Sequence, residues 1–388
     1  MSKNIIFCAD GTWNNSGTEA ENKVDAVSNV YKLFNYLSGV ATTPVEISEK
    51  TGQILEYEKS WIDAGQLKQI AKYINGVGNS TFKIKWAMGG AFGFGLIERI
   101  ARGYTFISRN YVPGDAIYIV GFSRGAYTAR ALAGLIVAKG VLATKYQQGE
   151  AESYDMAQRA WYSYRGNISY EKYTHRLQNL FTAFTSIKNY LLSVTLQESD
   201  FIKGVPVKLV GVWDTVGSLG IPDFEFGDKR AEVKDAFSFA DLDLSPKVQF
   251  GLHAIALDEA RMLFSPTLWN PRAGIQQVIF PGAHSDVGGG YVEHGLSDGA
   301  LKWMIQQLQG YGMMFRETIQ GITPNAEATA HKPWKSLVKL GNGLGKRVFY
   351  SKDNVHPHES LITRIGKKVS HDVGEDKVTY APTNWPPM

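Results

Sequence analysis

The sequence predicts an α/β protein in which a mostly parallel sheet is flanked by helices. Short apolar runs typical of buried strands, such as residues 5–9 and 117–120, alternate with segments whose apolar residues recur every three or four positions. The chain of 388 residues contains no internal repeat and no low-complexity linker. We therefore expect one domain that spans residues 1–388.

The first part of the chain is expected to alternate between strands and helices. A glycine-rich stretch at 89–95 is typical of a loop, and Pro113-Gly114-Asp115 is expected to end the helix that precedes it. The expected strands are 5–9, 54–63 and 117–120, and the expected helices pass through Val27–Phe34 and Ile97–Ile107.

The second part begins with a segment of different character. Residues 141–204 are polar, rich in aromatic residues and helical in pattern, without a strong strand, which is typical of an insertion into a sheet. After it we expect strands at 207–213 and 277–280, a helix at 253–262, a helix from Ser297 to Gly310, and an irregular remainder to residue 388.

Composition and charge exclude several classes of protein. The net charge of +4 comes from 41 basic and 37 acidic residues spread along the chain, which gives no support to nucleic-acid binding. Cys8 is the only cysteine, so no disulfide can form within the chain. The apolar run at the N-terminus is too short for a secretory signal. We expect synthesis in the cytoplasm, with any export by a route that needs no cleaved signal.

One motif indicates nucleophilic chemistry. Gly121-Phe122-Ser123-Arg124-Gly125 lies between an apolar strand and an alanine-rich helix. A sharp strand-to-helix turn needs small residues at both ends, and it holds the central serine in a strained geometry with its hydroxyl exposed. The position of the motif, more than its five residues, predicts that Ser123 is a catalytic nucleophile.

A serine nucleophile needs a base, and the base needs an acid that fixes its tautomer. Asp214 directly follows the strand predicted at 207–213, and His284 follows the strand predicted at 277–280. The order serine, acid, histidine is one in which such triads occur on parallel sheets. We therefore predict a triad of Ser123, Asp214 and His284.

Other acidic residues are alternatives for the partner of the histidine. Asp10, at the end of the first strand, is a weaker alternative that would border the site, and Asp286 would tune the loop of His284. Asp115 lies at the wrong end of its strand, and Asp258 and Glu259 are expected on the solvated face of a helix.

The oxyanion of the reaction needs at least two hydrogen-bond donors. The backbone N–H of Arg124, directly after the nucleophile, is the first expected donor. The second is expected from the loop of Gly11 and Thr12, because a glycine allows close approach of the backbone.

Two further patterns are weaker. The stretch 89–95 lacks the lysine of a phosphate-binding loop and the spacing of a dinucleotide fingerprint. His284, Asp286 and His294 have donor types found in metal sites, but Gly288–Gly290 among them is better explained as a tight turn. We expect no cofactor and no metal.

Four motifs in order carry a resemblance to a known family. They are Ala9–Asn14, Gly121–Tyr127, Gly211–Gly217 and His284–Tyr291. With them the chain resembles the uncharacterised α/β-hydrolase family that includes the phospholipase A effectors of type VI secretion, over nearly its whole length.

The resemblance implies an α/β-hydrolase fold, a triad on Ser123, Asp214 and His284, and ester hydrolysis with phospholipids as the best-known substrates. In such a fold the insertion at 141–204 would form a helical cap over the site. The expected partners are a phospholipid or other ester, a membrane surface, and a delivery or immunity protein. Two alternatives stay open: a soluble carboxylesterase that acts on smaller esters, and a catalytically idle module that binds a partner.

Overall fold

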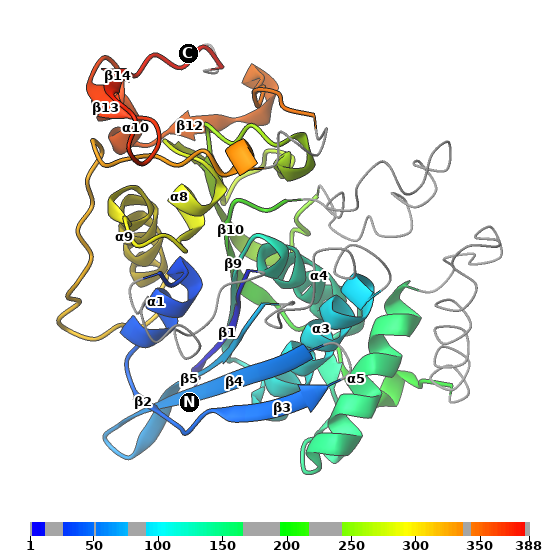
Figure 1. Cartoon of the computed structure of the whole chain (residues 1–388). Coiled ribbons are helices and arrows are strands. Elements are labelled where there is room, and N and C mark those ends of the chain that lie inside the picture. The colour runs from blue at the N-terminus through cyan, green and yellow to red at the C-terminus, as the bar shows by residue number, and fades with distance from the viewer. Residues whose placement is uncertain are drawn as a thin grey trace, which may run out of the picture.

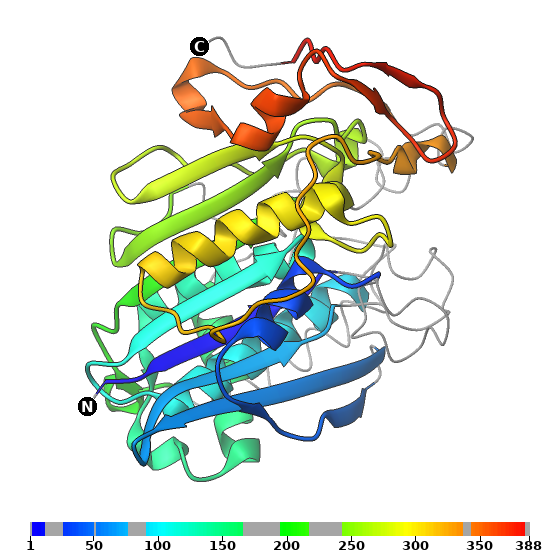
Figure 2. The same cartoon turned by 90° about the vertical axis from the view of Figure 1, so that its left-hand side faces the viewer.

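A computed structural model describes residues 2–11, 26–49, 52–76, 91–165, 195–216, 243–336 and 343–384. Its centre is a sheet whose strands lie side by side across the molecule (Figures 1 and 2). In sheet order the strands are β12 (Val355–Pro357), β11 (Ile275–Phe280), β10 (Val248–Ala256), β9 (Val207–Trp213), β6 (Ala116–Phe122), β1 (Asn4–Ala9), β5 (Gln66–Ile74), β4 (Gly52–Asp63) and β2 (Val40–Ala41), with β3 (Val45–Glu49) beside β4.

The strands from β12 to β5 are parallel, and β4 runs antiparallel to β5, β2 and β3 beside it. The carboxyl ends of β9, β6 and β1 therefore meet at one edge of the sheet. β5 pairs with one side of β1, and β6, the next strand in the chain, pairs with the other side. The strand order therefore reverses next to β1, and α/β proteins bind their ligands at such switch points.

Helices cover both faces of this sheet (Figure 1). On one face lie α3 (Ala91–Asn110), α4 (Arg124–Lys139) and α5 (Glu150–Arg165), and on the other α1 (Asn29–Tyr36), α8 (His284–Gly288) and α9 (Gly295–Gly310). Alternate residues of β1 enter the two cores, Ile5 and Phe7 on the first face and Ile6 and Cys8 on the second. This explains the unbroken apolar run of β1 and confirms the predicted α/β class.

The C-terminal part forms a layer over the β11–β12 edge of the sheet (Figure 2). It contains β12, α10 (Glu359–Arg364), and a hairpin of β13 (Lys368–Ser370) and β14 (Lys377–Thr379). Phe349, Leu361 and Tyr380 are buried there against Ile255 and Ile279 of the sheet. The segment expected to be irregular thus has short elements and a small core of its own.

Shorter elements complete the described fold. They are a two-stranded pair of β7 (Val141–Leu142) and β8 (Phe201–Ile202), and the 3-10 turns η1 (Thr144–Tyr146), η3 (Glu198–Asp200), η6 (Met262–Phe264), η7 (Pro333–Ser336) and η9 (Ser351–Asp353).

Three local predictions were wrong. The helix expected at 253–262 is instead the end of β10 and the loop after it, since a short apolar run buried on both faces has no strand-like alternation. Part of the loop expected at 89–95 begins α3, and residues 89 and 90 lie outside the described residues. Ser297 lies inside α9, whose N-cap is His294.

The insertion at 141–204 is described only in part. Its helix α5 packs against α3 and α4, with Ala157 and Trp161 buried in the core on that face. Residues 166–194 lie outside the described residues. The cap therefore stays a prediction.

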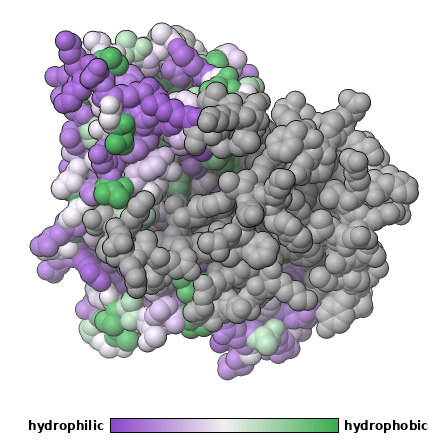
Figure 3. Space-filling model, viewed as in Figure 1, coloured by the Kyte–Doolittle hydropathy of each residue, from purple (hydrophilic) through white to green (hydrophobic). Residues whose placement is uncertain are grey.

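Figure 3 shows hydrophilic residues over most of the described part of one face, with apolar residues scattered singly. None of the helices in the described ranges is long and apolar enough to cross a bilayer.

Candidate active site

Ser123 lies at the turn between β6 and α4, at the carboxyl edge of the sheet. Its backbone has φ 57° and ψ −120°, a region that non-glycine residues rarely adopt. The turn is held by the N–H of Ser123, which donates to the carbonyl of Trp213 at the end of β9 (3.1 Å), and by the N–H of Tyr127, which donates to the carbonyl of Ser123 (3.2 Å). The strain predicted for this serine is present, but Ser123 is buried, so the expectation of an exposed hydroxyl was wrong.

Both glycines of the motif lie where a side chain has no space. A Cβ on Gly121 would lie 2.3 Å from the carbonyl oxygen of Gly125, and a Cβ on Gly125 would lie 2.1 Å from the carbonyl oxygen of Ala9. The first turn of α4 thus passes directly over the end of β1. This close passage explains why small residues stand on both sides of the serine.

Asp214 and His284 are in direct contact. Asp214 follows β9 and is fully buried, with a left-handed backbone at φ 39°. His284 is the first residue of α8, and its Nδ1 lies 2.6 Å from Oδ2 of Asp214. The two residues predicted as acid and base are brought together across 70 positions of sequence.

The charges of this pair are set by their surroundings. Burial alone would raise the pKa of Asp214, but the charge of Arg347 and the hydrogen bonds from His284 and Arg347 hold that pKa well below its ordinary value. Burial lowers the pKa of His284, although Asp214 opposes this shift. At neutral pH Asp214 is therefore ionised and His284 neutral, with its proton on Nδ1 and its Nε2 available to accept one.

The imidazole of His284 lies beside the turn of Ser123. It packs on the ring of Phe122, the residue before Ser123, with 4.6 Å between ring centroids, and on Phe264 at 5.0 Å. Its Nε2 is buried and has no hydrogen-bond partner, so no bond to Ser123 is formed in this structure. Catalytic hydrogen bonds often tighten only when substrate is bound.

Two charged residues support the pair, and the sequence analysis did not identify either role. Arg347 is buried and donates to both carboxylate oxygens of Asp214, at 2.6 and 2.9 Å. Glu259 is buried rather than solvated, and it accepts from the N–H of His284 (3.2 Å) while Arg261 holds its carboxylate. Neither residue lies in a motif, and neither is near its partner in sequence.

Asp10 lies near the turn of Ser123, since a Cβ on Gly125 would lie 2.5 Å from its carbonyl oxygen, but its side chain is engaged elsewhere. It accepts hydrogen bonds of 2.6 Å each from the N–H of Gly11 and the hydroxyls of Ser28 and Tyr73. Gly11 would have to exchange this bond to act as an oxyanion donor. Thr12 lies outside the described residues, and Arg124 is the first residue of α4, where backbone N–H groups point beyond the helix end.

Asp286 forms a separate pair. Its Oδ1 lies 2.6 Å from Nδ1 of His331, and its Oδ2 accepts from the N–H groups of Ala283 and His331. It therefore braces the turn that begins α8 and does not compete with Asp214 for the imidazole of His284. In the part of the chain that the structure describes, no three His, Cys, Asp or Glu side chains gather in a way that would hold a metal ion.

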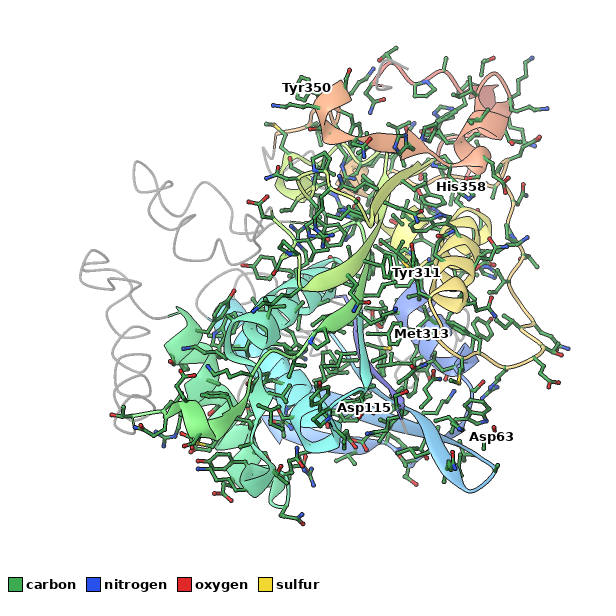
Figure 4. The ribbon with its side chains drawn as sticks, turned by 180° about the vertical axis from the view of Figure 1, so that it is seen from behind. Asp63, Asp115, Tyr311, Met313, Tyr350 and His358 are labelled. Atoms are coloured by element: carbon green, nitrogen blue, oxygen red, sulfur yellow. The ribbon has the colours of Figure 1, made fainter. Side chains whose placement is uncertain are left out.

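Asp115 lies far from this edge, as expected. It stands at the start of β6, where it bonds the N–H groups of Lys3 and Val112 and pairs with the ammonium of Lys3. Figure 4 shows Asp115 at the opposite end of the molecule from Tyr350 and His358, which belong to the C-terminal layer.

Comparisons with known proteins found one family model that matches most of the chain. The model of the family described as "T6SS, Phospholipase effector Tle1-like, catalytic domain" matches residues 3–307. "Uncharacterized protein YEL023C" of Saccharomyces cerevisiae is 27% identical over 281 residues, which are 71% of this chain and 34% of that protein.

Two solved structures are similar at low identity. The crystal structure of an uncharacterized protein from Pseudomonas aeruginosa has a TM-score of 0.48 and 16% identity, and the match covers 84% of this chain and 49% of that one. The structure of the Tle1 effector bound to the VgrG spike of the type VI secretion system has a TM-score of 0.44 and 16% identity, covering 92% and 84%. The chain thus spans about a third of the yeast relative and about half of the first of these structures.

Proposed function

Because the chain belongs to the Tle1-like phospholipase effector family of type VI secretion, a family of hydrolase catalytic domains, we propose that it is a serine ester hydrolase that releases acyl chains from phospholipids. The observation that carries the proposal is the 2.6 Å contact between Asp214 and His284, beside a serine held at a strained strand-to-helix turn. Strained backbone of this kind is found mainly at functional sites.

The proposed reaction has two halves. Ser123 Oγ attacks the ester carbonyl while His284 Nε2 takes its proton, and the alcohol leaves with the proton from His284. Water, activated by His284, then releases the fatty acid from the acylated Ser123. Asp214 keeps the proton of the imidazole on Nδ1 and stabilises the imidazolium that forms in each half.

The oxyanion of each half needs donors. The N–H of Arg124 is the proposed first donor, because it follows the nucleophile and begins α4. A second donor from the loop of Gly11 and Thr12 remains part of the proposal. Loss of one such donor costs about 10²- to 10³-fold in rate.

Phospholipids are the preferred substrate class because the family is one of phospholipase effectors. On the same ground we propose export by a type VI secretion system, with a delivery protein as partner and an immunity protein in the producing cell. Comparing the protein in culture supernatants of strains with and without an assembled secretion system tests this part.

The activity is tested by fatty-acid release from vesicles of mixed phospholipids. Ser123→Ala should lower turnover by about 10⁶-fold, because a triad does not work without its nucleophile. Ser245→Ala, at the start of β10 and the opposite end of the sheet, is the matched control and should keep the wild-type rate.

The outcomes separate the alternatives. Release that disappears only in Ser123→Ala supports the lipid acyl hydrolase. Cleavage of short soluble esters without release from vesicles would replace it with a carboxylesterase. Absence of both activities in the folded wild-type protein would favour a module that binds a partner.

A further inference from the structure

We infer that Arg347 is a positioning residue for the triad: its guanidinium holds the carboxylate of Asp214, and through it the imidazole of His284, in the orientation that proton transfer requires. This inference rests on the proposed function of Ser123, Asp214 and His284. Arg347 lies beyond residues 3–307, the part that matches the family model, so the site draws on the C-terminal layer as well.

The contact between Arg347 and Asp214 is a two-point one. Nη1 donates to Oδ1 at 2.6 Å and Nη2 donates to Oδ2 at 2.9 Å. Oδ2 is also the atom that accepts from Nδ1 of His284 at 2.6 Å. Because one oxygen is shared, any rotation of the carboxylate that breaks the guanidinium contact also moves the acceptor of the imidazole proton.

The guanidinium is itself fixed. Its Nη1 donates to the carbonyl of Ala256 at 2.6 Å, and its Nη2 donates to the carbonyl of Phe264. Ala256 ends β10, next to β9, and Phe264 also packs on the ring of His284. The planar guanidinium binds the carboxylate of Asp214 at two points and the two carbonyls as well, a geometry that a lysine ammonium cannot reproduce.

The backbone on either side of Arg347 is anchored to the loop after β10 and to the C-terminal core. The N–H of Gly345 donates to the carbonyl of Ala260 at 2.9 Å, and Phe349 is buried in the C-terminal core. Arg347 points inward, while Lys346 and Val348 on either side of it are exposed. The alternation directs one side chain of this stretch at the triad acid.

The backbone conformation of Asp214 is one that surrounding contacts have to stabilise. Its backbone is left-handed, at φ 39°, which costs free energy in a residue other than glycine. The N–H of Ala256 donates to Oδ1 of Asp214 at 2.9 Å. Together with the guanidinium of Arg347, it binds the carboxylate on the sides that His284 does not contact. With these donors in place, Oδ2 accepts the hydrogen bond from Nδ1 of His284 in a fixed orientation.

The charge of Arg347 has a second effect. The negative charge of Asp214 favours the imidazolium form of His284. The positive charge of Arg347 offsets it, and so helps to keep His284 neutral and able to act as a base. Removing the charge while keeping a hydrogen bond, as in Arg347→Gln, should make His284 easier to protonate. Arg347→Lys keeps the charge and loses the fork, so the two variants separate charge from geometry.

The test compares kcat/KM for a soluble chromogenic ester across pH in the full-length chain. Titration with a fluorophosphonate counts the intact active sites. The rate is then calculated per intact site, so unfolded protein does not lower it. We expect Arg347→Gln to lower kcat/KM per site by about 10²-fold and to move the acid limb upward by about one pH unit. Arg347→Lys should lower the rate and keep the wild-type acid limb.

Arg272→Gln is the matched control. Arg272 donates to the carbonyls of Leu244, Ser245 and Val248 at the start of β10, at the end of the sheet opposite the site. Its loss should lower stability without changing the rate per site or the acid limb. If Arg347→Gln behaves in the same way, Arg347 is merely structural and the inference is wrong.

A second readout does not depend on activity. In histidine-labelled protein, the proton NMR signal of Nδ1–H of His284 reports the hydrogen bond to Asp214. The signal is assigned by its loss in His284→Gln. Arg347→Gln should shift or broaden this signal and raise the titration midpoint of His284. An unchanged signal and midpoint would overturn the inference. Absence of ester hydrolysis in the wild type, with the NMR change present, would reject the proposed function and leave the positioning contact standing.

Discussion

The tight passage of α4 over β1 makes Gly125→Ala the most informative single change near the proposed nucleophile. The new Cβ would lie 2.1 Å from the carbonyl oxygen of Ala9 and 2.5 Å from that of Asp10. Both neighbours are backbone atoms, so neither can rotate away. To restore an ordinary contact of 3.4 Å, the first turn of α4 must move away from β1 by about 1.3 Å.

The size of this shift sets the expected effect. Ser123 is joined to the same turn, and a displacement of about 1 Å in a reacting group lowers the rate by about 10²-fold. Overpacking of a close-packed site also lowers the free energy of unfolding by about 1–3 kcal/mol. We therefore expect Gly125→Ala to lose about two orders of magnitude in kcat/KM per site and to melt at a lower temperature.

The assay is ester hydrolysis with intact sites counted by fluorophosphonate, together with thermal unfolding. Gly310→Ala is the matched control, because a Cβ at the end of α9 meets nothing within 4 Å, so its rate and stability should be those of the wild type or slightly better. A Gly125→Ala enzyme with a rate per site within about twofold of the wild type would refute the reasoning.

Two further predictions concern pH. In the proposed mechanism His284 must be neutral to accept the proton of Ser123, and burial lowers the pKa of His284 below the ordinary 6.5. We therefore expect kcat/KM to fall only below pH 6.5. An acid limb at or above pH 6.5 would contradict the mechanism. Burial raises the pKa of Asp258 from 3.8 to about 6. The folded state then binds this proton more tightly than the unfolded state, so the free energy of unfolding should fall as pH rises from about 4 to 6. Urea titrations should show that Asp258→Asn removes part of this fall, and an unchanged slope would be evidence against the shift.

The sequence was sufficient for the fold class and for the contact between Asp214 and His284. Asp214 directly follows β9, and His284 follows β11 after three residues. The carboxyl ends of these parallel strands lie at one edge of the sheet, so local position brings the two residues near each other. The turn of Ser123 could be predicted for a similar reason, since its strand, its small residues and its helix are contiguous in the chain.

The remaining features depend on packing between distant segments. Arg347 reaches Asp214 across 133 positions, and no local pattern marks an arginine that will be buried. The prediction of Glu259 on a solvated helix face was wrong, because the end of β10 and the loop after it have no strand-like pattern. Leu252 and Ala254 enter one core and Ile255 another, so that strand is apolar on both faces and carries no alternation.

The central claim is that Ser123 is the nucleophile of an ester hydrolase. Mapping of a fluorophosphonate adduct by peptide mass spectrometry tests it most directly. The account predicts one adduct, on the peptide of Ser123, that is retained in Ser245→Ala and lost in Ser123→Ala together with fatty-acid release. An adduct on another residue, or undiminished fatty-acid release by Ser123→Ala, would contradict it.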